Sequence, residues 1–234
     1  ALSDTLTVEV SRDKKQWSQS YQRGKPKGKL TQKDNARNRR GTSIKFHPDP
    51  QIFGDKAAFR ATRLYRLARS KAYLYKGVEI RWKCAPEKLR DAKDTPEKAT
   101  LHFPGGLSDF LAESLEDRET VTPKPFAGEG DLNGSSGRVE WAVTWPEFGD
   151  GDMSSYCNTV PTAQGGTHET GLRTALSRGL KAYGEMTGNK RANQIVADDV
   201  MISACGLLSV FIPDPQFQGQ TKEKLSTPGV ARLV

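Results

Sequence analysis

Cysteine and histidine are scarce in this sequence of 234 residues, which has three of each. Cys84, Cys157 and Cys205 are odd in number and widely spaced, which argues against a disulfide framework and against a zinc site. We expect them to be small buried hydrophobic side chains in a reducing cytoplasm. The sequence also lacks an apolar run long enough to span a bilayer and an apolar signal region at its start. These absences favour a globular cytoplasmic protein.

The three histidines, His47, His102 and His168, lie far apart in the sequence. No carboxylate pair and no serine nucleophile stands with them in a recognisable spacing. We therefore expect no complete catalytic constellation and no metal site within this chain. For His168, at the start of a predicted helix, a capping or packing role is expected.

Negative charge is scarce in one part of the chain only. Residues 1–50 hold twelve Lys or Arg and five Asp or Glu, a net charge of +7, whereas the remaining residues hold 24 and 23, a net charge of +1. The excess is concentrated in residues 23–40, a stretch of glycine, proline and like charges that predicts a loop. Such a loop is either a solvated insertion or a contact for phosphate backbones.

Strands dominate the predicted start of the chain. Residues 5–10 alternate between apolar and polar side chains, which is typical of a half-buried strand, and residues 17–21 are expected to return beside it. Residues 43–46 form a third strand. Pro48 and Pro50 then end it, because proline cannot donate a backbone hydrogen bond.

This proline pair marks the predicted boundary between a domain of residues 1–50 and one of residues 51–234. Beyond it, Asp55 is expected to cap a helix. Apolar residues at helical spacing extend this helix: Ala58, Ala61, Leu64, Tyr65, Ala68 and Ala72.

The clearest strand is residues 138–145, where Val139 and Val143 share one face with two tryptophans. We expect it to form a hairpin with residues 154–160. Residues 206–212 form a short apolar run that predicts a buried strand. The glycine-rich residues 126–137 are expected to be mobile.

Further helices are predicted at residues 107–115 and from Thr167 as N-cap, with another restarting near Thr221. The long helix that follows Thr167 should bury one stripe of side chains: Leu172, Ala175, Leu176, Leu180 and Tyr183. The alternation of strands and helices describes an α+β fold in which helices cover one sheet.

After the apolar run, Pro213 and Pro215 force the chain out of the core. The segment that follows is predicted to be a loop that carries Gln220-Thr221-Lys222. A lysine charge beside the donors of a glutamine amide suits a terminal phosphate, although most exposed lysines only solvate a surface.

Three motifs resemble the B subunits of bacterial type IIA topoisomerases, and they occur in the order of that family. Residues 214–225 (DPQFQGQTKEKL) are similar to its switch loop. Residues 161–173 (PTAQGGTHETGLR) are similar to its second hallmark, and residues 40–49 (RGTSIKFHPD) to the end of its ATPase domain. The TPKPF stretch at 122–126 and the PTAQGG form resemble the topoisomerase IV branch more than the gyrase branch.

The resemblance implies a fold. Residues 1–50 would be the C-terminal strands of a GHKL ATPase domain. Residues 51–234 would be a transducer domain, a ribosomal-protein-like β-α-β fold with a left-handed crossover. That handedness runs against the general rule for such connections, so it rests on the resemblance alone.

The resemblance also implies roles for single residues. Lys222 would contact the γ-phosphate of ATP with the help of Gln220, and Thr42 would lie near the adenine. Arg12 would lie at the rim of an inhibitor pocket, and Arg173 would line the cavity for a transported DNA duplex. For Arg173 the sequence pattern alone favours an ion pair with a neighbouring carboxylate.

ATP and Mg²⁺ would serve the intact subunit, and most of their ligands would precede Ala1. The partners would be DNA, the A subunit of topoisomerase IV and a second B subunit in an A₂B₂ enzyme. We expect residues 1–234 alone neither to hydrolyse ATP nor to cleave DNA. Two alternatives stay open: a gyrase B subunit, and a separate basic nucleic-acid-binding module built on residues 23–40.

Overall fold

The computed structural model describes residues 2–34, 39–90, 92–115, 118–132 and 137–234. Its contacts divide the chain into two compact units, residues 1–60 and 61–234, each described by itself below. Among the residues that the structure describes, no helix is long and apolar enough to cross a membrane.

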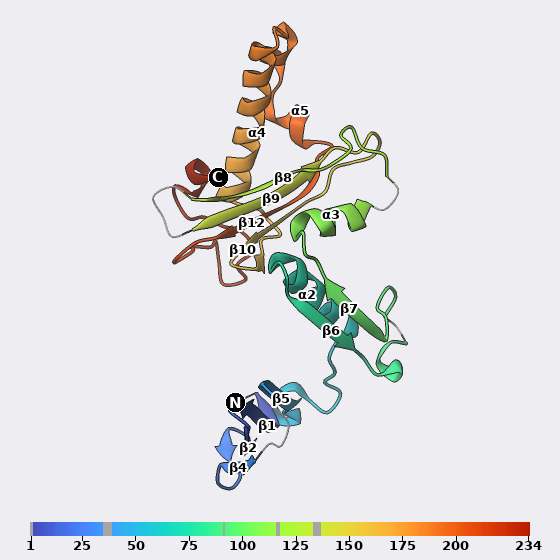
Figure 1. Ribbon diagram of the computed structural model, residues 1–234, viewed down its shortest axis with the longest axis vertical. Coiled ribbons are helices and arrows are strands. Elements are labelled where there is room, and N and C mark those ends of the chain that lie inside the picture. The colour runs from blue at the N-terminus through green and yellow to red at the C-terminus, as the bar shows by residue number, and fades with distance from the viewer. Residues whose placement is uncertain (1, 35–38, 91, 116–117, 133–136) are drawn as a thin grey trace. The chain divides into compact units, whose positions relative to one another are not determined.

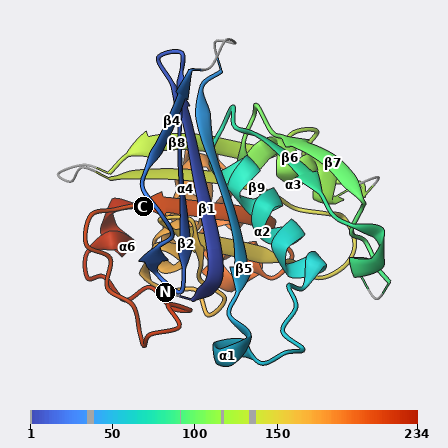
Figure 2. The same ribbon diagram turned by 90° about the horizontal axis from the view of Figure 1, so that it is seen from below.

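The first unit is an antiparallel sheet (Figure 2). Its strands follow the order β3-β2-β1-β5, with β4 also pairing with β2. Asp13 and Lys14, both with positive φ, form the tight turn between β1 and β2, as the right-handed twist of a hairpin requires. The elements are β1 (Ser3–Arg12), β2 (Lys15–Gln22), β3 (Lys25–Pro26), β4 (Thr31–Asp34), β5 (Gly41–Pro48) and the short helix α1 (Pro50–Phe53).

Part of the basic segment 23–40 is strand, so the predicted loop is wrong there. β3 and β4 both pair with β2, and every residue of both is exposed. An exposed edge strand gains its backbone hydrogen bonds without an apolar face, so it leaves no hydrophobic periodicity to detect. Residues 35–38 of the segment lie outside the described residues.

The helix predicted from Asp55 begins later, at Ala61. The chain turns at Gly54, whose carbonyl accepts from the Ala57 amide, and the Phe59 ring packs edge-on against Phe46 of β5 with centroids 5.8 Å apart. These contacts keep residues 54–60 out of helical conformation.

The second unit is a five-stranded sheet of order β11-β10-β12-β9-β8 with helices on both faces (Figure 1). The strands are β8 (Phe126–Asp131), β9 (Arg138–Thr144), β10 (Met153–Cys157), β11 (Val160–Pro161) and β12 (Cys205–Phe211). A separate hairpin consists of β6 (Glu79–Lys83) and β7 (Lys98–His102). The helices are α2 (Ala61–Leu74), α3 (Leu107–Leu115), α4 (Thr167–Met186), α5 (Ala197–Met201) and α6 (Val230–Leu233), with the 3-10 turns η1 (Pro86–Lys88) and η2 (Lys190–Gln194).

β12 is the central strand and is buried on both faces. Leu208 and Val210 pack into one core with α4, while Cys205 and Leu207 pack into the other, which α2 and α3 cover. A strand covered on both sides is apolar at nearly every position, which explains the apolar sequence of β12, with the buried Ser209 as its exception.

The hairpin predicted between residues 138–145 and 154–160 is wrong. β12 lies between β9 and β10, antiparallel to the first and parallel to the second. The apolar β12 takes the centre of the sheet, and the chain reaches it from β10 through α4, which forms a β-α-β unit. The left hand of this crossover stays a prediction from the resemblance.

The stretch 126–137, expected to be mobile, contains β8, which pairs with β9 along its length. Gly128 of this strand makes room for a side chain of β9. A Cβ at this position would lie 2.6 Å from the Trp141 ring, so the missing side chain leaves room for the indole. Residues 133–136 lie outside the described residues.

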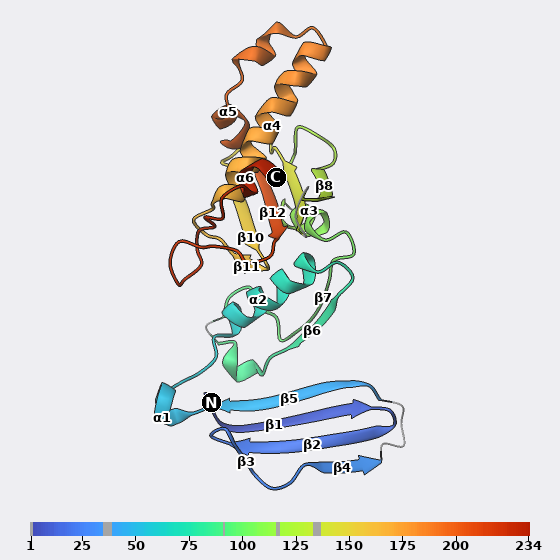
Figure 3. The same ribbon diagram turned by 90° about the vertical axis from the view of Figure 1, so that its left-hand side faces the viewer.

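The buried residues of α4 lie mostly in its first half, and Gly184 is the exception. Leu172 and Leu176 belong to the core. The other three residues of the stripe, predicted to be buried, are exposed: Ala175, Leu180 (39%) and Tyr183 (65%). The distal half of the helix extends beyond the sheet, with η2 and α5 returning along it (Figure 3). There Gly184 packs against Ala192 of η2. Helical periodicity therefore marks a face without showing what covers it.

His168 in the first turn of α4 is fully buried, as a packing histidine should be. Its Nε2 lies 3.1 Å from Thr162 Oγ1, which lies 2.5 Å from Ser155 Oγ on β10. Burial lowers the pKa of the imidazole to about 4. The three side chains form a buried hydrogen-bonded chain that joins β10, the segment after β11 and α4.

Replacing Leu208 by alanine tests the central position of β12. Because Leu208 is fully buried, we expect Leu208→Ala to lower the free energy of unfolding by about 2–5 kcal/mol. Leu180→Ala, at a 39% exposed site, should cost less than about 1 kcal/mol. Urea denaturation followed by tryptophan fluorescence measures both. Equal losses would contradict the burial of Leu208 in the core.

His168 makes stability depend on pH. Its pKa in the folded state is about 4, against 6.5 ordinarily, so between these values only the unfolded chain takes up the proton. The contribution of the neutral His168 to the free energy of unfolding is complete above pH 6.5. About 3 kcal/mol of it is lost as the pH falls to 4. His168→Gln should remove this slope, and His102→Asn should keep it. A slope that His168→Gln leaves unchanged would rule the assignment out.

Candidate functional site

Residues 216–226 form a narrow loop closed by its own backbone. The Gln218 amide donates to the Lys224 carbonyl at 2.9 Å, and the Ser226 amide donates to the Gln216 carbonyl at 2.9 Å. We call this segment the lysine loop, because Lys222 lies at its tip.

The tip of the lysine loop is exposed and turned, not helical. Gln220 and Lys222 are both exposed, and Lys222 adopts a left-handed backbone with φ of 58°. The helix predicted to restart near Thr221 is therefore wrong, since a left-handed residue ends a right-handed helix. The Lys222 Nζ lies 5.8 Å from the centre of the Phe217 ring. The tip thus presents a cation and an amide to solvent.

The loop is joined to the turn that precedes α4. The Leu225 amide donates to the Gly165 carbonyl at 3.0 Å, and the Thr167 amide donates to the Leu225 carbonyl at 3.1 Å. A Cβ on Gly166 would lie 2.2 Å from the Leu225 carbonyl oxygen, so this approach requires glycine. The structure thereby brings together residues 165 and 225, which belong to two different motifs and are 60 positions apart in the sequence.

This contact also shifts the start of α4. Gly166, with φ of 144°, is the N-cap, and the predicted cap Thr167 is instead the first helical residue. The Thr167 amide already bonds to Leu225, and its buried Oγ1 has no hydrogen-bond partner among the described residues. Backbone pairing with the lysine loop, not a side-chain cap, begins the helix.

Arg173, two turns along α4, forms an ion pair with Asp198 of α5. The ion pair favoured by the sequence pattern is confirmed. Arg173 also lines an open hollow of about 450 Å³, together with Lys224 and Glu169. The Arg173 guanidinium is half exposed, so it stays accessible to solvent at this hollow.

In the first unit, Arg12 and Thr42 line a single hollow of about 500 Å³. Thr42 pairs with Val10 across the β1–β5 ladder, and the Arg12 guanidinium lies 3.3 Å from Asp13. These two predicted residues therefore meet within one unit, whereas Gln220 and Lys222 belong to the other.

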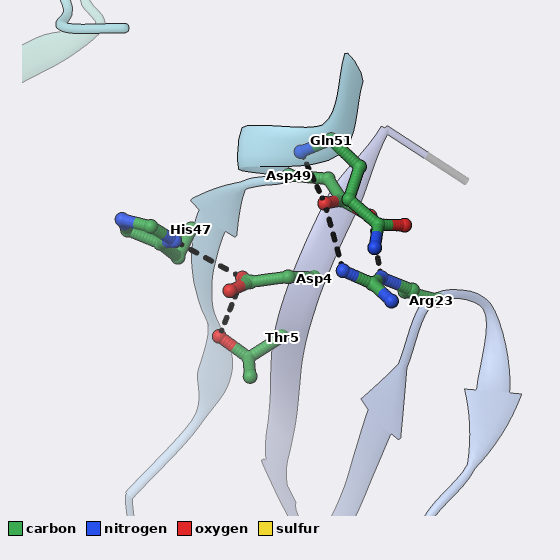
Figure 4. Close-up of polar contacts among 6 residues, drawn as sticks. All are labelled: Asp4, Thr5, Arg23, His47, Asp49 and Gln51. Carbon is green, nitrogen blue, oxygen red and sulfur yellow. Dashed lines mark hydrogen bonds and ion pairs between the residues drawn. The ribbon is translucent and has the colours of Figure 1, made fainter. Parts of the chain in front are cut away.

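At the opposite end of the same strands, Asp49 ties the chain together where it leaves the sheet (Figure 4). Its buried carboxylate accepts from Arg23 Nε at 2.8 Å and from the Gln51 amide at 2.9 Å, which caps α1. The Arg23 hydrogen bond holds the pKa of Asp49 below its usual value. Beside it, His47 Nδ1 lies 3.1 Å from Asp4.

Within the described ranges, no cluster of three or more His, Cys, Asp or Glu side chains could hold a metal ion. Cys157 and Cys205 are buried, as expected, and Cys84 is partly exposed. Burial raises the pKa of the Cys157 thiol to about 11, which suits a packing role.

Solved structures resemble the whole chain. The aminocoumarin-bound 43K ATPase domain of Thermus thermophilus gyrase B matches with a TM-score of 0.82 at 28% identity, over 100% of this chain and 62% of that one. The topoisomerase IV ATP-binding domain of Francisella tularensis, in complex with a small-molecule inhibitor, matches with a TM-score of 0.75 at 31% identity, over 99% and 60%.

Curated relatives are more similar in sequence. The B subunits of DNA topoisomerase 4 from Bartonella bacilliformis and from Caulobacter vibrioides are each 53% identical over the whole of this chain. The chain spans about a third of their length, 34% of each. The family model for DNA gyrase B matches residues 106–234, more than half of the chain. The chain therefore belongs to the DNA gyrase B family, the B subunits of type IIA topoisomerases, and its named relatives at 44–53% identity are topoisomerase IV subunits.

Proposed function

We propose that this chain relays the state of bound ATP to the DNA-handling parts of a topoisomerase IV B subunit. In this account residues 51–234 are the transducer domain, and residues 1–50 complete an ATPase domain. The intact enzyme relaxes and decatenates DNA as an A₂B₂ assembly, using ATP and Mg²⁺. The observation that carries the proposal is the exposed cation at the tip of a loop that is hydrogen-bonded to α4.

The lysine loop fits a terminal phosphate by its chemistry. Lys222 offers a compact charge and Gln220 offers amide donors, and both are exposed. The neighbouring carboxylate of Glu223 accepts a hydrogen bond from Gln164 Nε2 at 2.9 Å, which satisfies part of its acceptor capacity. Lys222 would therefore bind the γ-phosphate, and Gln220 would assist.

The other predicted residues take roles around this contact. Thr42 would lie near the adenine and Arg12 at the rim of the inhibitor pocket, and both line one hollow of the first unit. Arg173 would contact the transported duplex by exchanging Asp198 for a backbone phosphate. Release of the phosphate contact after hydrolysis would let the two units move relative to each other.

Removing the Lys222 charge tests the proposal. In the intact subunit, Lys222→Ala should lower ATP turnover by about 100-fold or more, because a positioned cation stabilises the charge that develops during phosphoryl transfer. Lys224→Ala removes an equal charge two residues away and should change turnover by less than about threefold. Steady-state ATPase rates and thermal melting measure both variants. Turnover that Lys222→Ala leaves at the wild-type level would contradict the phosphate contact.

A further inference from the structure

Gln164 holds the residue next to Lys222 with two hydrogen bonds. Its backbone amide donates to the Glu223 carbonyl at 2.8 Å, and its side-chain Nε2 donates to Glu223 Oε2 at 2.9 Å. Gln164 belongs to the turn before α4, and Glu223 directly follows Lys222 in the chain. We call this pair of bonds the Gln164 clamp.

The Gln164 clamp lies beside Lys222, whose backbone conformation is unfavourable without support from its surroundings. Lys222 has a φ of 58°, a left-handed conformation that is unfavourable for a residue with a side chain. Such a conformation persists only where the surrounding structure determines it. On one side the Lys222 amide contacts the Gly219 carbonyl at 3.4 Å, a long hydrogen bond. On the other side the clamp fixes Glu223, so it sets the direction in which Lys222 leaves the loop.

The turn that carries Gln164 is itself fixed by hydrogen bonds to the sheet and to α4. Thr162, two residues earlier, bonds to the buried His168 and to Ser155 of β10. The Gly165 amide donates to the Thr162 carbonyl at 2.8 Å. The clamp is thus anchored to the sheet and to α4, and it transmits their position to the lysine loop.

We propose that Gln164 is a positioning residue for Lys222, acting through Glu223, and that it couples the lysine loop to the first turn of α4. This inference rests on the proposed function of Lys222 and assigns the residue that aims it. A movement of α4 that carries Gln164 away would also withdraw Lys222 from a phosphate. Coupling of this kind is reciprocal.

Side-chain variants in the intact subunit test the clamp without disturbing the core. Gln164→Ala and Glu223→Ala should each lower ATP turnover about two- to tenfold, the effect of one hydrogen bond. Glu223→Gln keeps an acceptor oxygen and should retain near wild-type turnover. The double variant Gln164→Ala/Glu223→Ala should be no worse than either single variant, because both remove the same bond.

Backbone amide hydrogen exchange of residues 216–226 reports how firmly the lysine loop is held, independently of ATP turnover. In the absence of nucleotide, Gln164→Ala should speed exchange in this segment at an unchanged melting temperature. Gln218→Ala is the control, because this exposed glutamine joins the loop through its backbone and its side chain can be removed without breaking that pairing.

Each outcome has one meaning. Faster exchange with lowered turnover, in Gln164→Ala but not in Gln218→Ala, supports the clamp. Unchanged exchange, or faster exchange with wild-type turnover while Lys222→Ala still lowers turnover, overturns the clamp and leaves the proposed function standing. If Lys222→Ala itself has no effect, the proposed function fails and the clamp loses its role with it.

Discussion

The pairing of Leu225 with the Gly165-Gly166 turn is the constraint on which the functional part of this structure depends. Its two backbone hydrogen bonds do three things at once. They tie the lysine loop to the turn before α4, they satisfy an amide at the start of α4, and they require glycine at position 166. Buried backbone groups must find partners, and here two distant segments supply them to each other.

This constraint links an exposed loop tip to a helix that is anchored in the core. The tip of the lysine loop is exposed and left-handed at Lys222, whereas α4 is anchored in the core by Leu172 and Leu176. Arg173 lies on the same helix and is paired with Asp198 of α5. A helix that touches the lysine loop at its first turn and carries an accessible arginine two turns later is suited to relay a change from one site to the other.

The sequence predicted the parts of this arrangement better than their assembly. β12 and α3 could be recognised because apolar content and helical spacing report burial directly. β8 and β4 could not, since one is rich in glycine and the other is an exposed edge. The pairing of β12 between β9 and β10 escaped prediction because a strand pattern carries no record of its neighbours.

The same limit applies to the site. Lys222, Gln220 and Arg173 were singled out from motifs, and Arg12 and Thr42 from a third motif. The contact of Gln164 with Glu223 was missed, although both residues stand inside those motifs, because a hydrogen bond between segments leaves no periodic signal. The two glycines before Thr167 were the available clue, as a glycine pair at a helix start often permits another backbone to approach closely.

A crystal structure of the intact subunit with a non-hydrolysable ATP analogue would show directly whether Lys222 binds the terminal phosphate. We expect Lys222 Nζ to lie about 2.8 Å from an oxygen of the terminal phosphate, the distance of a charge-assisted hydrogen bond. We also expect Gln164 still to hold Glu223 in that state. A lysine loop that points away from the nucleotide, with the terminal phosphate bound entirely by other residues, would contradict the proposed role of Lys222.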